Sequence, residues 1–340
     1  MQTNDQNSRY HAILQGLGAE LAGVDRVISN RLSSEVDLVR QVAQHIIQGG
    51  GKRMRPTLVV LCARALAHHA RAHQRSIELP EASIAELAGI VEFIHTATLL
   101  HDDVVDESGL RRNRETANAL FGNAASVLVG DFLYSRAFQM MVGVNSLPVM
   151  AVLSEATNVI AEGEVLQLMN CQDPDVDEAR YLQVIRFKTA KLFEASACLP
   201  AVLAGEPADV IEAFACYGRH LGTAFQLTDD ILDYSGDKSE MGKQLGDDLR
   251  EGKPTLPLIR LLATGSASDQ ALIRQAILEP QSIDIDAVID RVRHSDAIDY
   301  ARQAAELECQ AARSGLETIA ESEAKTSLLD LVSFVLERQG

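Results

Sequence analysis

Two aspartate-rich segments of this chain share a pattern that suits metal chemistry. The pattern L-x-D-D-h-h-D-x-S, with h aliphatic, places aspartates at Asp102, Asp103 and Asp106 and again at Asp229, Asp230 and Asp233. Two aspartates four residues apart project from one face of a helix, so their like charges repel each other. The negative end of the helix dipole, at the C-terminus, also disfavours them. Hard divalent cations between the segments would remove both costs, and Mg²⁺ prefers such oxygen ligands. A solvated charge run explains one copy equally well, but two copies after apolar helices favour a metal–diphosphate site.

Basic residues elsewhere in the chain could complete an anion site. Gly49-Gly50-Gly51 is followed by Lys52 and Arg55 at a predicted helix start, where backbone N–H groups and the helix dipole attract phosphate. The segment lacks the G-x-x-x-x-G-K-[ST] pattern of a nucleotide P-loop. Arg111 and Arg112 follow the first aspartate segment, either as a second diphosphate contact or as a surface turn that balances the aspartates.

Further polar residues lie in apolar or glycine-rich surroundings. His95 precedes Asp102 by seven residues and shares its helical face, so it is either a phosphate contact or a core histidine. Residues 234–253 form either a surface loop or a lid that closes Lys243 and Lys253 over phosphate. Apolar helices also carry Lys188, Thr189 and Gln226.

Composition limits the remaining classes of function. The 340 residues include 31 Lys and Arg against 48 Asp and Glu, a net charge of −17 that argues against a nucleic-acid binder. The five cysteines are scattered and show no disulfide or zinc spacing. The N-terminus is polar and resembles no signal peptide, and we expect no transmembrane segment. These features predict a cytoplasmic protein.

The elements that must position these residues are predicted to be helices almost throughout. Ala, Leu, Glu, Gln and Arg dominate long stretches with helical periodicity. The predicted fold is a single all-α domain over residues 9–340, preceded by a disordered tail at 1–8. The expected helices span 9–30, 34–48, 53–70, 83–107, 117–142, 148–171, 178–203, 207–235, 254–263, 268–280, 283–293, 296–319 and 323–338.

The combination of motifs resembles the trans-prenyl diphosphate synthases over nearly the whole chain. The resemblance rests on GGGKRMRP, DDVVDESGLRR, FKTAKLFE and QLTDDILDYSGD with GKQLGDDLREGKPTLP. Other stretches, such as EFIHTATLLHDDVVD and NVIAEGEVLQL, look most like bacterial long-chain members that form octaprenyl (C40) or solanesyl (C45) diphosphate for quinone side chains such as that of ubiquinone. The resemblance implies a helical bundle of the isoprenoid-synthase type with a central catalytic cavity, usually a homodimer.

The resemblance also assigns roles to single residues. It implies about three Mg²⁺ per active site, held directly by Asp102, Asp106 and Asp229. Asp103, Asp230 and Asp233 would hold metal-bound waters or neighbouring side chains. The isopentenyl diphosphate would bind Lys52, Arg55, His95 and Arg112. The allylic diphosphate would bind Arg111, Lys188, Lys243 and Lys253. Thr189 and Gln226 would face the reacting carbons.

The implied reaction is ionisation of the allylic diphosphate, condensation with isopentenyl diphosphate, and loss of a proton. Short-chain relatives carry bulky aromatics just before the first aspartate segment, whereas Ala97 and Thr98 are small and imply an open hydrophobic tunnel. We expect Met141 and Leu153 at its floor, although ordinary core packing is the more common role of such residues. Release of so long a product could involve transient membrane contact.

Two other functions remain open from the sequence. A class I terpene cyclase also uses an aspartate-rich metal site in an all-α fold, but it needs no second diphosphate site. A non-catalytic partner subunit of a prenyl synthase typically loses aspartates from one segment, and both segments are complete here.

Overall fold

The computed structural model describes residues 3–49, 51–111, 114–236 and 245–338. Arg112 and Lys243, both predicted to bind diphosphate, lie outside the described residues. The chain divides into two compact units, which are described separately. Unit 1 comprises Met1–Thr157, Leu192–Gly218 and Gly315–Leu331. Unit 2 comprises Asn158–Lys191, Arg219–Ser314 and Val332–Gly340.

The first half of the chain supplies most of unit 1. Its helices are α1 (Thr3–Gly16), α2 (Gly18–Arg31), α3 (Asp37–Gln48), α4 (Met54–Ala72), α5 (Glu81–Val105), α6 (Ala117–Phe121), α7 (Asn123–Val144) and α8 (Leu147–Asn170). A short antiparallel hairpin of β1 (Leu110–Arg111) and β2 (Arg114–Glu115) follows α5. Helix α8 continues past Thr157 and so contributes to both units.

The second half is also helical. It contains α9 (Glu178–Ile185), the π-helical turn η1 (Arg186–Ala190), α10 (Lys191–Leu203), α11 (Ala208–Ser235), α12 (Asp247–Arg250), α13 (Leu256–Thr264), α14 (Ala267–Leu278), the 3₁₀ turn η2 (Pro280–Ser282), α15 (Ile285–Arg293), α16 (Ala297–Gly315) and α17 (Glu323–Glu337). Helices α11 and α17, like α8, contribute to both units.

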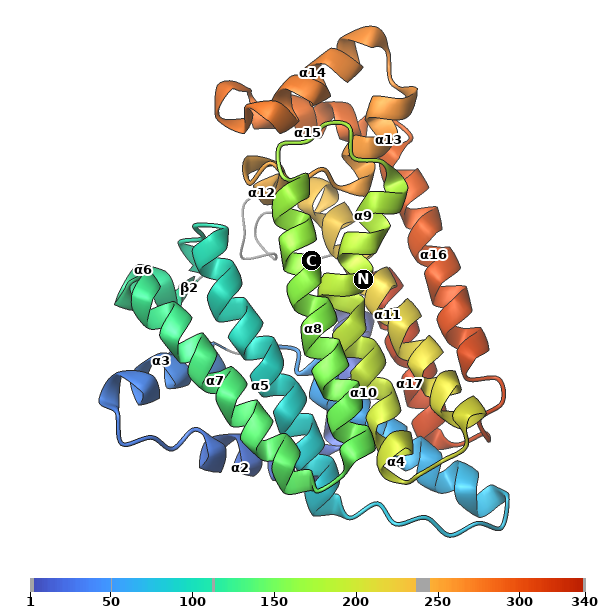
Figure 1. Cartoon of the computed structure of the whole chain (residues 1–340). Helices are drawn as coiled ribbons and strands as arrows, with labels where there is room; N and C mark the ends of the chain where they lie inside the picture. The colour runs from blue at the N-terminus through green and yellow to red at the C-terminus, as the bar shows by residue number, and fades with distance from the viewer. Residues whose placement is uncertain (1–2, 50, 112–113, 237–244, 339–340) are drawn as a thin grey trace. The chain divides into compact units, whose positions relative to one another are not determined.

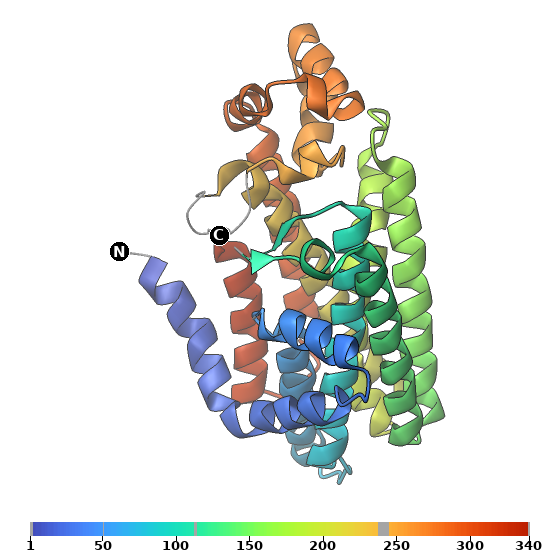
Figure 2. The ribbon, with the colours of Figure 1, turned by 90° about the vertical axis from the view of Figure 1, so that its left-hand side faces the viewer.

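The all-α prediction is confirmed, and the differences lie at joints. The predicted helix 9–30 is broken at Leu17 between two glycines, and α1 and α2 meet there at an angle (Figure 2). The predicted helix 117–142 is broken at Gly122, whose φ of 84° is favourable for glycine alone. The predicted loop 234–253 contains the short helix α12.

The predicted domain boundaries stay predictions. Helix α1 begins at Thr3, within the tail predicted to be disordered over residues 1–8. The structure divides the region predicted as a single synthase domain, 9–340, into two compact units, and helices such as α8, α11 and α17 have residues in both.

Helix α5 is the core element of unit 1. It packs against α2, α4 and α7, and it lies beside α7 along much of its length (Figure 1). Leu87, Ile90, Ile94 and Ala97 are fully buried. Among the described residues, α5 alone is long and apolar enough to cross a membrane, which the sequence did not lead us to expect, but 61% of its apolar 18-residue window is buried. That burial is typical of the central helix of a globular unit.

Unit 2 has its own apolar clusters around the C-terminal part of α11. Tyr234 at the end of α11 is fully buried among α12, α13, α14 and α15, with Leu249, Leu258, Ile277 and Val288. A second cluster joins α9 to α11 and α16, through Tyr181, Ile185, Leu227 and Ala305. These clusters fix the end of α11, where the second aspartate segment lies.

Gly218 generates a test of packing within unit 1. A Cβ at this position of α11 would lie 2.5 Å from the Phe193 carbonyl oxygen and 2.9 Å from the Glu194 Cα of α10. Because both atoms are backbone, Gly218→Ala should lower the free energy of unfolding by about 1–3 kcal/mol. Urea denaturation measures this change.

Gly143→Ala is the matched control. Gly143 is exposed on α7, and a Cβ there would meet nothing within 4 Å. Alanine should therefore raise the free energy of unfolding, by up to about 1 kcal/mol through helix propensity. Equal effects of the two substitutions would contradict the close approach of α10 and α11.

Candidate active site

The first aspartate segment lies at the C-terminus of α5. Asp106 is the C-cap residue, and its backbone N–H donates to the Asp102 carbonyl at 2.8 Å. Asp102 and Asp106 are both half-buried, one turn apart on the same face. Asp103 is rotated away from that face and is only 1% exposed. The segment therefore presents two accessible carboxylates and buries one.

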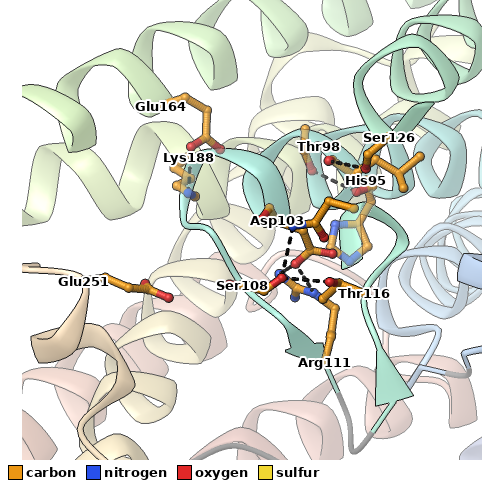
Figure 3. A network of polar contacts seen from close by, with 12 residues as sticks. His95, Thr98, Asp103, Ser108, Arg111, Thr116, Ser126, Glu164, Lys188 and Glu251 are labelled. Carbon is orange, nitrogen blue, oxygen red and sulfur yellow. Dashed lines mark hydrogen bonds and ion pairs between the residues drawn. The ribbon is translucent and has the colours of Figure 1, made fainter. Parts of the chain in front are cut away.

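The buried Asp103 carboxylate is neutralised by Arg111. The Nε and an Nη of Arg111 both lie 2.8 Å from Asp103 Oδ1 (Figure 3). Burial raises the pKa of Asp103, the Arg111 guanidinium opposes that shift, and Asp102 and Asp106 reinforce it. Arg111, predicted to bind the allylic diphosphate, therefore already pairs with Asp103 of the first aspartate segment.

Thr116 and Asn118, which follow the hairpin, bond to the backbone of α5 and of the loop after it. Asn118 Nδ2 donates to the Asp103 carbonyl at 2.9 Å and to the Ser108 carbonyl at 3.1 Å. The Thr116 hydroxyl donates to the same Ser108 carbonyl at 2.7 Å (Figure 3). The chain reversal after the aspartates is therefore tied to the aspartate segment itself.

The other predicted site residues of unit 1 lie on α4 and α5 or just before them. Lys52 is exposed ahead of α4, and its carbonyl accepts from the Tyr10 hydroxyl. The half-buried Arg55 guanidinium stacks over the Phe193 ring, 4.5 Å from its centroid. His95 is half-buried on α5, where its carbonyl accepts from the Thr98 hydroxyl at 2.8 Å.

The predicted tunnel residues are mostly core positions. Ala97, Met141 and Leu153 are all fully buried, on α5, α7 and α8, and Thr98 is half-buried. All four belong to unit 1.

The second aspartate segment lies near the C-terminus of α11 in unit 2. The Asp229 side chain is 47% exposed, and Arg338 Nη2 lies 3.2 Å from its Oδ1. Asp230 is buried, and its carboxylate accepts from the Tyr181 hydroxyl at 2.5 Å and from Gln226 Nε2 at 2.8 Å. Burial, reinforced by the charge of Asp248, raises the pKa of Asp230 well above its usual range.

Asp233 is buried, whereas Asp106, the third aspartate of the first segment, is half-buried. Asp233 is 6% exposed, and its carboxylate accepts from the backbone N–H groups of Asp247 and Asp248 at 3.1 and 3.2 Å. Those are the first residues of α12, so Asp233 satisfies donors that a helix start leaves unpaired. Asp233 thus holds α12 onto α11. Lys253, just beyond α12, pairs with Glu251 at 2.5 Å.

The π-helical turn η1 presents two predicted site residues. Lys188 Nζ lies 2.6 Å from Glu164 Oε2 of α8. The Thr189 hydroxyl donates to Gln226 Oε1 at 2.9 Å, and Gln226 in turn donates to Asp230. Thr189, Gln226 and Asp230 therefore form one chain of hydrogen bonds in unit 2.

The accessible carboxylates fit magnesium. Among the described residues no group of three or more His, Cys, Asp and Glu is gathered in metal-binding geometry. Mg²⁺ commonly takes only one or two carboxylates and completes its shell with water and phosphate oxygens. The half-buried pair on α5 and the accessible Asp229 suit that mode of binding.

Three residues of the site were not predicted from the sequence. Tyr181, Glu164 and Arg338 contact Asp230, Lys188 and Asp229 respectively. Their partners are remote in sequence, and no local spacing or composition marks them.

The fold, with aspartates ending two long apolar helices, is that of the isoprenoid synthases. The family model described as polyprenyl synthetase matches residues 36–292, and the chain belongs to this family.

Individual relatives match over nearly their whole lengths. Octaprenyl diphosphate synthase of Escherichia coli (strain K12) is 47% identical, over 94% of this chain and 96% of that protein. The all-trans-nonaprenyl-diphosphate synthase (geranyl-diphosphate specific) of Rhodobacter capsulatus is 43% identical, over 96% of this chain and 97% of that protein. The polyprenyl synthase of Caulobacter crescentus CB15, whose crystal structure is a complex with calcium and isoprenyl diphosphate, is 40% identical with a TM-score of 0.90, covering 97% of this chain and 98% of that one.

The bond between Tyr181 and Asp230 can be tested by Tyr181→Phe. Its loss leaves the buried Asp230 carboxylate short of a donor and should lower the free energy of unfolding by about 1.5–3 kcal/mol at a pH where Asp230 is ionised. Because this bond lowers the pKa of Asp230, the loss should shrink as the pH falls into the range where Asp230 is protonated. Urea denaturation at several pH values measures both effects.

Tyr300→Phe controls for loss of a tyrosine–carboxylate bond in general. The Tyr300 hydroxyl donates to Glu178 at 2.7 Å at a half-buried position, where water can replace it. The expected loss is about 0.5 kcal/mol. A pH-independent loss of the same size in both variants would contradict the role given to Tyr181.

Proposed function

We propose that this chain is a long-chain trans-polyprenyl diphosphate synthase. It adds isopentenyl diphosphate units to an allylic primer such as farnesyl diphosphate and gives octaprenyl (C40) or solanesyl (C45) diphosphate for a quinone side chain. Family membership and the extent of identity to named long-chain synthases support this activity.

One structural observation supports the metal assignment above all. Of the six aspartates, those implied as direct Mg²⁺ ligands, namely Asp102, Asp106 and Asp229, retain accessible side chains. Those implied to act indirectly are buried and bonded to protein, namely Asp103, Asp230 and Asp233. A solvated charge run would show no such division, because all its carboxylates would face water.

The accessible aspartates would hold about three Mg²⁺, which when bound neutralise the diphosphate and improve it as a leaving group. In this proposal Lys52, Arg55 and His95, with Arg112, bind isopentenyl diphosphate. Arg111, Lys188 and Lys253, with Lys243, bind the allylic diphosphate.

The reaction then follows from charge stabilisation. The cationic side chains stabilise negative charge on the departing diphosphate, so the allylic C–O bond breaks to a carbocation. Thr189 and Gln226 face the reacting carbons, and apolar walls exclude water that would trap the cation. The double bond of isopentenyl diphosphate attacks, and the released diphosphate takes the proton.

Exposed apolar side chains support a homodimer. Leu128, Phe138 and Val142 are 66%, 43% and 65% exposed, and their spacing places them on one side of α7. Such a face suits a self-complementary contact with a second copy. A cytoplasmic location, with transient membrane contact for product release, completes the proposal.

Removal of one accessible carboxylate from either segment tests the metal assignment. Asp102→Ala and Asp229→Ala should each lower kcat about 10³-fold or more, because charge stabilisation at the leaving group is lost. Turnover of farnesyl with isopentenyl diphosphate measures this, and circular dichroism should show an unchanged helical fold.

Asp299→Ala is the control, since Asp299 is 73% exposed and pairs with Arg302 one turn away on α16. It should keep normal turnover. Near-normal turnover in Asp102→Ala or Asp229→Ala would refute the assignment, and turnover of the allylic substrate alone would indicate a cyclase.

Product length tests the direction of the tunnel. Ala97→Phe places a ring in the fully buried core of α5, and Thr98→Phe does so at a half-buried position that tolerates volume more easily. Both should shorten the product, as chromatographic sizing can show. Ala82→Phe, exposed at the other end of α5, should leave it unchanged. Full-length product from both test variants would exclude this direction.

A further inference from the structure

Gly163 of α8 lies directly against the π-helical turn η1. A Cβ at this position would fall 2.6 Å from the Lys188 backbone nitrogen and 2.9 Å from the Phe187 carbonyl carbon. These are backbone atoms that cannot rotate away, so only glycine permits this approach. The turn closes with a bond from the Lys191 N–H to the Arg186 carbonyl. Such π-turns inside helices frequently lie at functional sites.

The residue after Gly163 pairs with Lys188. Glu164 Oε2 lies 2.6 Å from Lys188 Nζ, and the two side chains are 29% and 18% exposed (Figure 3). Because both side chains are half-buried, this short pair is screened less than a fully exposed ion pair. Because the contact of Gly163 with η1 fixes both backbones, the pair fixes the direction of the Lys188 ammonium.

Thr189 is fixed from a different helix. Its hydroxyl donates to Gln226 of α11, and Gln226 donates to the buried Asp230. Consecutive residues of η1 are therefore oriented independently, Lys188 by α8 and Thr189 by α11. A lysine ammonium has three N–H donors, so it can bond to Glu164 and to a phosphate oxygen at once.

We propose that Glu164 is a positioning residue that orients Lys188 for the allylic diphosphate, with Gly163 allowing the approach. This inference rests on the proposed function, in which Lys188 binds that diphosphate. Two effects of Glu164 oppose each other. Its carboxylate repels an incoming anion, although the Lys188 ammonium would lie between that carboxylate and the anion. The ion pair also holds Lys188 in one rotamer before binding, so binding costs less side-chain entropy. We expect orientation to outweigh the repulsion of the diphosphate by Glu164, because the Lys188 ammonium already neutralises most of the charge of that carboxylate.

Two substitutions at this position separate orientation from charge. Glu164→Ala removes the acceptor and should raise the KM for the allylic substrate about tenfold, while kcat and the KM for isopentenyl diphosphate stay within about twofold. Glu164→Gln keeps an acceptor oxygen without the charge and should restore most of the allylic KM. Glu162→Ala is the control, because Glu162 is exposed on α8 and accepts a hydrogen bond from Asn158 one turn earlier.

A double-substitution cycle tests whether Glu164 acts through Lys188. In a Lys188→Ala background, Glu164→Ala should add no further change in allylic KM. An additive effect would overturn the proposal, as would an unchanged or lower KM in Glu164→Ala alone. Equal melting temperatures of Glu164→Ala and Glu164→Gln would show that the difference between them is not one of folding.

Calorimetric binding of inorganic pyrophosphate in the presence of Mg²⁺ gives a readout that does not depend on turnover. Glu164→Ala should bind this probe about tenfold more weakly than the unsubstituted protein. Equal affinities would overturn the role of Glu164. Absence of turnover in the unsubstituted protein would instead overturn the proposed function, so the two failures are distinguishable.

Discussion

Carboxylates at the ends of long apolar helices impose the constraint on which the site depends. A carboxylate that leaves water must find donors or a counter-charge, or it takes up a proton. Both aspartate segments meet this requirement at their second aspartate, through Arg111 for Asp103 and through Tyr181 and Gln226 for Asp230. The first aspartate of each segment stays accessible. The hairpin, the π-turn and the contacts of α9 all serve this arrangement.

The same sequence pattern gives different outcomes at the third aspartate. Asp106 caps α5 and stays half-buried, because the chain after it turns away into an exposed loop and hairpin. Asp233 is covered by α12, whose first N–H groups it accepts. One segment thus offers two accessible carboxylates and the other offers one. The resemblance to prenyl diphosphate synthases implies the same division for metal binding, which the burial of these residues supports.

Local pattern was sufficient to predict the helices because their apolar periodicity and good helix formers recur over many turns. It failed at joints such as Gly122 and at the short helix α12, where single glycines or distant partners decide the backbone. The aspartates and basic residues were recognisable by type and spacing. Tyr181 and Glu164 were not, because each matters only through a partner that the fold brings near.

In the proposed mechanism, Asp102, Asp106 and Asp229 bind magnesium together with a single diphosphate. A crystal structure of the protein with Mg²⁺ and an unreactive allylic diphosphate analogue tests it most directly. We expect metal ions coordinated by oxygens of all three side chains and by oxygens of one diphosphate. A diphosphate bound elsewhere, or ions that leave Asp229 or the α5 pair uncoordinated, would contradict it.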